Sequence, residues 1–368
     1  MIYIHVPFCH RKCTYCAFYS VRSSENGVRS YVDAVLVEME ERKGEQAHPI
    51  KTVYFGGGTP SILPIDQLSR IVDSLRRSFD LSQLEEMTLE ANPEDLAPEY
   101  LVILKTLGFN RLSIGIQSLD DKVLRMLNRH HTAQQALEAV ETARLAGFGN
   151  ISVDFIYGLP EYPELPEVPD GVTHVSAYAL TVEPGTALAV QVEQGRVVLP
   201  SEEEVVQQYY ALHHALEAAG FRQYEVSNYA RPGFESKHNS RYWDRTPYLG
   251  LGPGAHSFDG VRRRWNVCNV EKYISGLSGT SGGSGTSGIS EEETLTPADA
   301  YNELLMTSLR TVRGLPLAAV PEAYKERLHR GMQPYIKCGW IVLREGSFAP
   351  TEEGLLHADG MASSLFVE

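Results

Sequence analysis

A chain of 368 residues, of which 43% are hydrophobic, is long enough to fold as one large domain or two ordinary ones with a sizeable core. Its formal net charge of −14 argues against a nucleic-acid partner, because such a partner requires a basic face. No apolar run reaches the roughly 18 residues that a membrane helix needs, and the first residues lack the basic segment of a signal peptide, so neither is expected.

The first half of the chain alternates short apolar runs with helical patterns. This alternation is typical of strand–helix repeats that build a parallel sheet. Six such strands favour an incomplete barrel over a closed eightfold one, so the predicted fold class is α/β, an incomplete parallel (β/α)6 barrel. The expected strands are residues 3–7, 52–55, 87–90, 111–116, 151–156 and 174–180, and the expected helices are residues 30–43, 65–79, 98–107, 121–127 and 132–146.

One crossover in this half is unusually short. Only thirteen residues separate Pro160 from His174, and three of them are prolines, which interrupt any helix. A parallel crossover normally needs about a dozen residues or more and carries a helix. Either the helix is lost here or the segment is altered.

The pattern changes after the sixth strand. A helix over residues 202–219 precedes a stretch rich in Tyr, Gly and His, in which the glycines predict a tight loop over the barrel mouth. Further helices at 297–311 and 317–325, a hairpin at 340–349 and a last helix from Thr351 predict a small winged-helix-like α+β domain. This tail has no basic run, which favours packing or a lid over DNA binding. The predicted divisions are a partial barrel (1–185), an extension (186–274), a flexible Gly/Ser linker (275–290) and the C-terminal domain (291–368).

Three of the five cysteines, Cys9, Cys13 and Cys16, lie on one loop directly after the first expected strand. Three soft sulfur ligands suit either zinc or an iron–sulfur cluster. A structural zinc site takes four protein ligands, so His5 or His10 would have to complete it. A four-iron cluster on three thiolates leaves one iron open to a ligand, and the spacing favours this interpretation.

The two other cysteines, Cys268 and Cys338, are isolated in the sequence. A disulfide scaffold would spread an even number of cysteines over a short secreted chain, and this chain has neither feature. Isolated cysteines in a large protein behave as small hydrophobic residues. We therefore expect both to be buried free thiols.

A glycine-rich segment, residues 56–60 (GGGTP), follows the second expected strand. Glycine at this place lets the backbone approach a ligand closely and offer its carbonyl oxygens. The cysteine spacing and this segment, in this order and at these strand ends, resemble the radical S-adenosylmethionine (SAM) superfamily. The resemblance implies a [4Fe–4S] cluster whose open iron binds SAM, and a one-electron reduction that cleaves a carbon–sulfur bond to give a 5′-deoxyadenosyl radical.

Other motifs narrow the resemblance to the family of oxygen-independent coproporphyrinogen III oxidase and its relatives. They are residues 3–9 (YIHVPFC), 90–93 (EANP), 113–118 (SIGIQS) and 156–160 (IYGLP). Similarity of this kind runs over most of the chain. It implies that SAM is surrounded by Tyr3, Tyr15, Gly57, Gly58, Thr59, Glu90, Gln117, Arg129 and Asp154.

Three of these residues have side chains whose chemistry fits the implied ligand. Glu90 can accept a hydrogen bond from an ammonium or a ribose hydroxyl, and Arg129 can pair with a carboxylate. Asp154, at a strand end, can accept from ribose hydroxyls, as acidic residues do in nucleotide sites. His5 either orients the cysteine loop or is a satisfied histidine of the barrel, and the sequence leaves both open.

Two features separate the branches of this family. The decarboxylating oxidase carries one more cysteine two residues after the third cluster ligand, where this chain has Phe18. Residues 238–243 (HNSRYW) match the His-Asn-x-x-Tyr-Trp signature of the haem chaperone branch. That resemblance implies binding of haem as cargo and its delivery to haem-requiring client proteins in the cytoplasm. The alternative is a radical SAM enzyme, either a coproporphyrinogen III decarboxylase or a related methyltransferase.

Within this signature, His238 is a candidate axial ligand for haem iron. Imidazole is a good iron ligand, and Tyr242 and Trp243 offer flat faces to a porphyrin. A histidine among polar residues is more often a structural hydrogen-bonding group, so both interpretations stay open. Weaker candidates are His213, His214 and His256.

Overall fold

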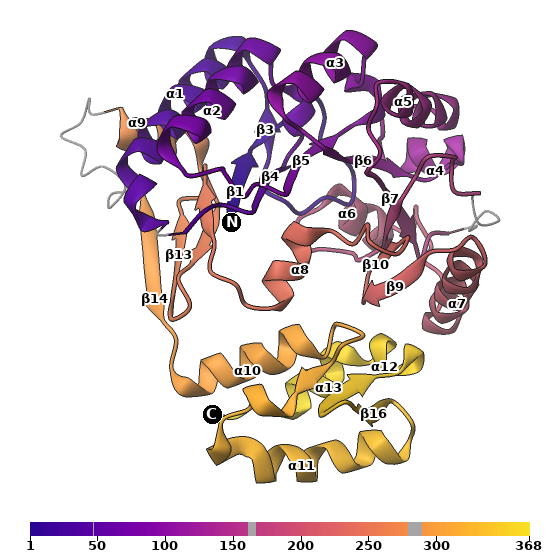
Figure 1. The fold of residues 1–368 in the computed structure, drawn as a ribbon. Helices are drawn as coiled ribbons and strands as arrows, with labels where there is room; N and C mark the ends of the chain where they lie inside the picture. The colour runs from indigo at the N-terminus through magenta and orange to yellow at the C-terminus, as the bar shows by residue number, and fades with distance from the viewer. Residues whose placement is uncertain (47, 161–166, 279–288) are drawn as a thin grey trace.

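The computed structural model describes residues 1–46, 48–160, 167–278 and 289–368. Its central sheet contains the six parallel strands that the alternating pattern predicts, adjacent in space in the order in which they follow one another in the chain (Figure 1). The sheet is open at both edges, so the predicted α/β class with an incomplete parallel barrel is confirmed. The strands are β1 (Ile2–Val6), β4 (Thr52–Gly57), β5 (Glu86–Ala91), β6 (Arg111–Gln117), β7 (Ile151–Tyr157) and β8 (His174–Ala179).

Three strands that the sequence pattern does not reveal extend this sheet at its edges. β11 (Leu249–Leu251) pairs in parallel with β1, whereas β10 (Asn228–Ala230) pairs antiparallel with β8 and with β9 (Arg222–Glu225). The expected loop over the barrel mouth is therefore wrong, because the glycine-rich stretch begins as an edge strand. Glycine is required at Gly250, since a Cβ there would lie 1.9 Å from the carbonyl oxygen of His256.

Helices cover the outer face of the sheet, and their caps explain where they begin. α1 (Glu25–Arg42) starts earlier than its apolar pattern predicts, because the Ser24 side chain accepts a hydrogen bond from the Gly27 N–H and caps the helix. α5 (Ala133–Leu145) begins with a capping box at Thr132. The other helices of this part are α2 (Ile65–Ser78), α3 (Pro98–Leu107), α4 (Asp121–Met126), α6 (Ala187–Glu193) and α7 (Glu202–Ala218).

The two faces of the barrel strands differ in chemistry. Side chains alternate along a strand, and one set, which includes Ile4, Phe55 and Leu89, belongs to the hydrophobic core under the helices. The other set faces the barrel interior and is mostly polar. The barrel interior therefore contains hydrogen-bonding and charged side chains below the carboxyl ends of the strands. This interior set includes Tyr3, His5, Thr52, Tyr54, Glu90, Arg111, Ser113, Asp154 and His174.

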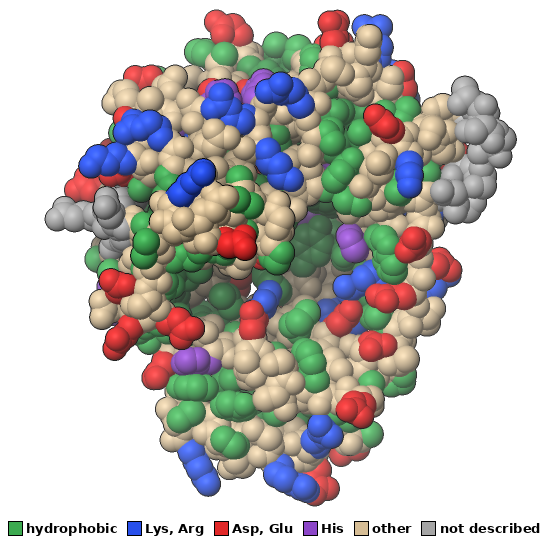
Figure 2. All heavy atoms as spheres, turned by 180° about the vertical axis from the view of Figure 1, so that it is seen from behind, with side chains coloured by type: hydrophobic (Ala, Val, Ile, Leu, Met, Phe, Trp, Pro, Cys, Tyr) green, Lys and Arg blue, Asp and Glu red, His purple; other side chains and the backbone are tan. Residues whose placement is uncertain are grey.

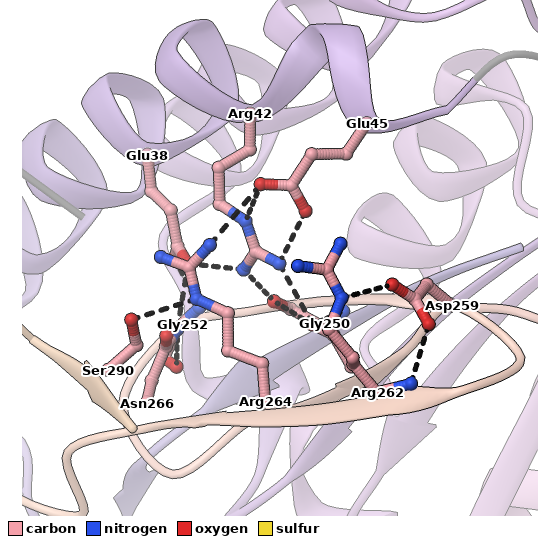
Figure 3. Close-up of polar contacts among 11 residues, drawn as sticks. Glu38, Arg42, Glu45, Gly250, Gly252, Asp259, Arg262, Arg264, Asn266 and Ser290 are labelled. Carbon is pink, nitrogen blue, oxygen red and sulfur yellow. Dashed lines mark hydrogen bonds and ion pairs between the residues drawn. The ribbon is translucent and has the colours of Figure 1, made fainter. Parts of the chain in front are cut away.

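A buried ion pair fastens α1 to the edge strand β11 and the turn after it (Figure 3). Arg42 Nη1 lies 2.9 Å from Glu38 Oε1, and the two side chains are 1% and 0% exposed. Arg42 also donates to the carbonyl oxygen of Gly250, and Glu38 accepts from the N–H of Gly252. Asn266, more than two hundred residues along the chain, donates to the same carboxylate. The extension is therefore tied to the first helix of the barrel by charge-assisted hydrogen bonds.

The predicted linker over residues 275–290 is wrong at both of its ends. α9 (Val270–Leu277) continues into it, and β14 (Ser290–Thr294) begins at its last residue. Leu277 is buried in the last turn of α9, an anchor that the Ser/Gly composition conceals. Residues 279–288 lie outside the described part of the chain. β14 completes an antiparallel sheet with β12 (His256–Phe258) and β13 (Arg262–Asn266).

The short crossover connects β7 and β8, which are parallel neighbours. Of its residues, 161–166 lie outside the described part. The rest of the crossover, residues 167–173, contains no helix. The described residues thus agree with the expectation that this repeat lacks its helix, but they do not cover the whole segment.

A second hydrophobic core lies in the C-terminal part, which packs beside the barrel next to α8 (Lys237–Trp243) (Figure 1). The helix expected over residues 317–325 is wrong. Leu317–Ala319 form a single 3-10 turn, and α11 (Glu322–Lys337) runs on to include Pro334, a residue that usually ends a helix. The predicted hairpin is present. The remaining elements are α10 (Pro297–Ser308), β15 (Leu315–Pro316), β16 (Ile341–Arg344), β17 (Ser347–Pro350), α12 (Glu352–Leu356) and α13 (Ala358–Ser364).

The rear face of the molecule is hollowed near its middle, and hydrophobic side chains are visible inside the hollow (Figure 2). Basic side chains gather above the hollow on this face, whereas basic and acidic side chains are interspersed below it (Figure 2). In the part of the chain that the structure covers, no helix combines the length and apolar character needed to cross a membrane.

Candidate functional site

A cavity of about 520 Å³ lies at the carboxyl ends of the barrel strands. This is the end at which parallel α/β sheets and barrels bind their ligands, and the volume is in the range of small-molecule sites. Loops that follow β1, β4, β5, β6 and β8 contribute to its lining, together with residues of the last part of β7. The predicted site residues that the structure brings together here are Cys9, Cys13, Cys16, Tyr15, Gly57, Gly58, Thr59, Glu90, Gln117, Arg129 and Asp154.

The loop that carries the cysteines is closed and anchored by hydrogen bonds. Its two ends pair as the short parallel strands β2 (Phe8–Cys9) and β3 (Val21–Arg22). In its middle, the Thr14 N–H donates to the carbonyl oxygen of Leu127, and the Thr14 hydroxyl donates to that of Met126. The loop is therefore held over the barrel by contacts to the last residue of α4 and the residue after it.

The thiols on this loop are free and partly exposed to the cavity. The Thr59 hydroxyl donates to Cys9 Sγ over 3.4 Å, and Arg129 Nη1 donates to Cys13 Sγ over 3.4 Å. Burial raises the pKa of the Cys9 and Cys16 thiols, so a bound metal centre has to supply the charge that favours their thiolates. Cys268 and Cys338 are also free, but both are exposed, so the expectation that they are buried is wrong.

The cysteine loop fits a cluster better than a single metal ion. Among the described residues, no three His, Cys, Asp or Glu side chains converge closely enough to hold one ion. The ring nitrogens of His5 contact the Tyr3 hydroxyl at 3.1 Å and the Tyr19 carbonyl oxygen at 3.3 Å. His10 Nε2 lies 3.0 Å from Asp95 Oδ1. Both ring nitrogens of His5 are occupied, and His10, whose Nδ1 has no contact, converges with no two other such ligands among the described residues. Thiolates that bind different irons of a cluster need not converge on one point.

The glycine segment after β4 forms a cradle that no other residue could make. Gly57 has a φ of +109°, and a Cβ on Gly58 would lie 2.6 Å from the carbonyl oxygen of Phe8. The Gly57 N–H donates to Glu90 Oε2 over 3.1 Å, and the Tyr54 hydroxyl donates to Glu90 Oε1 over 2.8 Å. Burial raises the pKa of Glu90 to about 7. A cationic ligand beside this carboxyl would favour its ionised form.

Arg129 is held in place by its neighbours but keeps an unused donor. Nη2 donates to Asn92 Oδ1 over 2.7 Å and to the carbonyl oxygen of Gly115. Nε is buried and has no hydrogen-bond partner within the described structure. Buried donors are rarely left unpaired, so this one fits an acceptor on a bound ligand. Asn92, which also contacts Thr59, was missed at the sequence level although it lies in the EANP motif.

Two further predicted residues complete the cavity wall. Asp154 accepts a hydrogen bond of 3.3 Å from the Ser113 hydroxyl, and burial raises the pKa of its carboxyl. Gln117 has a φ of +62°, an uncommon conformation for a residue with a side chain. Such backbone strain clusters at binding sites, where the surrounding structure maintains it.

Tyr3 is not part of the cavity lining. It lies in the barrel interior, where its ring stacks on Tyr54 and its hydroxyl contacts His5 Nδ1. His5 is therefore a satisfied histidine of the barrel. Because Tyr54 in turn holds Glu90, Tyr3 supports the site from behind.

His238 lies away from the cavity, at the amino-terminal end of the strands. Its Nδ1 lies 2.9 Å from the hydroxyl of Thr52, the first residue of β4, and its Nε2 lies 3.1 Å from the Tyr242 hydroxyl. Its backbone N–H donates to Glu86, the first residue of β5. The side chain is fully buried, and burial lowers its pKa to about 3. Both ring nitrogens are occupied, which favours the structural interpretation of this histidine.

The weaker candidates for iron ligation also lie outside the cavity lining. His213 and His214, on α7, both lie 3.6 Å from Glu352 Oε1 at the contact with the C-terminal part. His256 stacks on Trp265 in the antiparallel sheet. His213 and His214 thus lie at one contact and His256 in a separate sheet, and none of them lines the cavity that contains the cysteines.

Comparison with known proteins agrees with this architecture. The model of the Radical SAM superfamily matches residues 3–166, and that of the HemN C-terminal domain matches residues 295–357. The solved structure of coproporphyrinogen III oxidase (HemN) from Escherichia coli superposes with a TM-score of 0.82 over 100% of this chain and 89% of that one, at 23% identity. The chain is thus a radical SAM protein with the fold of HemN, and its cofactors are a [4Fe–4S] cluster and SAM.

Sequence similarity over the full length identifies the branch. The chain is 38% identical to heme chaperone HemW of Mycobacterium tuberculosis (strain H37Rv), over 99% of this chain and 94% of that protein. It is 36% identical to heme chaperone HemW of Bacillus subtilis, over 96% and 92% of the two chains. The chain therefore belongs to the HemW family, as the signature at residues 238–243 predicts.

Proposed function

We propose that this protein binds haem and delivers it to haem-requiring client proteins, while the barrel cavity holds the cluster and SAM. The observation that supports the proposal most is its similarity, over nearly the whole chain, to curated heme chaperones. The cavity is consistent with it. Phe18, at the position where the oxidase has a further cysteine, lines the cavity and is 71% exposed. A phenyl ring cannot replace a thiol in catalysis, which disfavours decarboxylation of coproporphyrinogen III.

The three cysteines of the anchored loop would hold the cluster. Cys9, Cys13 and Cys16 share one cavity wall, and Thr59 and Arg129 donate to two of the sulfur atoms. Hydrogen bonds to cluster sulfur ligands tune the reduction potential. When bound, the cluster can supply one electron to the sulfonium of SAM.

The remaining cavity residues would bind and orient SAM. Glu90, held by Tyr54 and the Gly57 N–H, would accept from the ammonium of the methionyl group. The unpaired Nε of Arg129 would donate to the carboxylate. Asp154 would accept from the ribose hydroxyls, as acidic residues do in other nucleotide sites. Tyr15, Gly58, Thr59 and Gln117 line the same volume and would complete the fit.

We assign the protein to the cytoplasm. All five cysteines are free, and three of them must be available as thiolates for the cluster. A reducing compartment keeps thiols in this state. The clients would be haem proteins that meet the chaperone there.

One experiment tests the function directly. Anaerobically reconstituted protein, with dithionite and SAM, is incubated with haemin or with coproporphyrinogen III. We expect haem to remain bound through gel filtration, to pass to a haem-free b-type cytochrome added afterwards, and no protoporphyrinogen to form. The matched control is the triple variant C9A/C13A/C16A, which shows whether transfer depends on the cluster. Robust decarboxylation with no haem retained would exclude the chaperone function.

A further inference from the structure

We propose that haem docks across the mouth of the cluster cavity, with His130 as a ligand of the haem iron. This inference rests on the proposed haem binding and names its site. It differs from the interpretation of His238 as the ligand.

His130 is the unoccupied histidine of the cavity. Two histidines, His10 and His130, belong to the lining. His10 is paired with Asp95, whereas no hydrogen bond or ion pair reaches the His130 ring within the described structure. The next residue, His131, shows the contrast: it is buried, and its Nε2 contacts the carbonyl oxygen of Ile116. His130 is exposed and lines the cavity, so it stands at the rim with free ring nitrogens.

The segment that carries His130 is fixed to the cysteine loop. Asn128, two residues earlier, has a φ of +60°, and its side chain accepts from Arg11 Nη1 over 3.1 Å. The same side chain donates to the carbonyl oxygen of Lys12 over 2.9 Å. These bonds hold the His130 backbone beside the loop that bears the cysteines. An imidazole on an anchored segment loses less entropy when it binds a metal than one on a free loop.

The lining of the same cavity carries the other groups that haem requires. Phe18 and Tyr178 both line the cavity and are 71% and 44% exposed, although aromatic side chains gain from burial. A porphyrin stacked on them would cover these rings. Lys12 is exposed on the same lining, and its ammonium has no partner within the described structure. The Lys12 ammonium is thus free to form a charge-assisted hydrogen bond with a haem propionate.

The size of the cavity places haem at its mouth and not inside it. About 520 Å³ is a volume for one small-molecule ligand, and the proposed function already fills it with the cluster and SAM. A porphyrin on the rim would therefore close the cavity. Haem and SAM would use the same opening in sequence, so bound haem should slow the exchange of SAM.

The test uses cluster-loaded protein titrated anaerobically with haemin, read by the Soret band in difference spectra and by magnetic circular dichroism. We expect H130G to lose the ligand-dependent Soret shift and to bind haemin roughly tenfold or more weakly. Added imidazole should restore the shift, because it can occupy the vacant position. H214A, which removes an exposed histidine far from the rim, and H238Q are the controls, and both should keep the wild-type shift.

The possible outcomes distinguish failure of the proposed haem site from failure of the proposed haem-binding function. Wild-type binding that survives in H130G but is lost in H238Q would overturn the site and leave haem binding intact. Absence of haem binding by the wild type would overturn both. In a second measurement, release of labelled SAM is followed with and without haemin. Slower release supports the mouth position, and an unchanged rate contradicts it.

Discussion

The hydroxyl of Tyr54 donates a 2.8 Å hydrogen bond to Glu90 Oε1, directly behind the proposed SAM site. Burial raises the pKa of Glu90 to about 7, and this hydrogen bond opposes the rise. The carboxyl must be ionised to accept from an ammonium. Below pH 7 it is mostly protonated, so SAM binding should tighten as the pH rises through about 7 and level off above it. Well below pH 7, the affinity for SAM should change by roughly tenfold per pH unit.

The variant Y54F tests the origin of this dependence. Without the hydroxyl, the pKa of Glu90 rises further, and the midpoint of SAM binding should move to higher pH. Calorimetry of cluster-loaded protein between pH 6 and 9 measures the shift. Y210F, on the exterior helix α7, is the control and should behave as the wild type. An identical midpoint in Y54F and the wild type would show that Glu90 does not govern the affinity.

Cluster assembly should depend on three cysteines and no others. C9A, C13A and C16A should each lose the brown absorbance and most of the bound iron, because each removes one thiolate from the anchored loop. C268S and C338S are matched controls, since both thiols are free and exposed. Iron analysis after reconstitution decides the assignment. Loss of iron in either control would mean that the ligand set is larger than proposed.

Arg129 should contribute strongly to SAM affinity. A charge-assisted hydrogen bond typically stabilises by about 1.5–3 kcal/mol, so R129A should weaken binding by roughly ten- to a hundredfold. Iron content must be measured alongside, because Arg129 also donates to Cys13 Sγ. R330A removes an exposed arginine of α11 and should leave affinity unchanged. Full iron loading with unaltered SAM affinity in R129A would remove this side chain from the site.

The parts of the site that the sequence predicts are those carried by contiguous motifs. The cysteine loop and the glycine segment are each defined by local spacing, and period-two alternation places their strands side by side. Contacts between distant segments leave no such trace. Asn92 meets Arg129 only because β5 and β6 are neighbours, and the pairing of His238 with Thr52 joins residues 186 positions apart. The role of that histidine therefore could not be decided from its motif alone.

Amino-acid composition predicts the wrong secondary structure where a few contacts with distant segments decide it. Residues 275–277 have linker-like composition, yet they end a helix because Leu277 is buried. The glycine-rich stretch contributes an edge strand because Gly250 permits close approach of the chain at His256. In both cases a contact with a distant segment outweighs the local preference.

The buried pair of Glu38 and Arg42 should be the most sensitive polar contact outside the cavity. It joins α1 to the backbone of Gly250, within the edge strand β11, and of Gly252, just after that strand (Figure 3). β11 pairs with β1, the strand that leads into the cysteine loop. R42M leaves the Glu38 carboxylate buried without a cationic partner, at a cost of about 3–5 kcal/mol. In E38Q the Arg42 guanidinium keeps its second partner, Glu45, whose oxygen lies 2.8 Å from Nη2. R42M should therefore lower the midpoint of chemical denaturation markedly and reduce cluster loading at ordinary temperature, and E38Q should do so to a smaller extent.

The matched control is the exposed pair of Glu141 and Arg144, also within one helix and with side chains 49% and 47% exposed. Exposed pairs contribute about 0–1 kcal/mol, so E141Q should denature almost as the wild type does. The double variant E38Q/R42M separates loss of the pair from the penalty of an unpaired charge. It should be less destabilised than the sum of the two single variants, because neither charge then remains buried alone. Strict additivity would show that the two side chains stabilise the protein independently, through their separate backbone contacts.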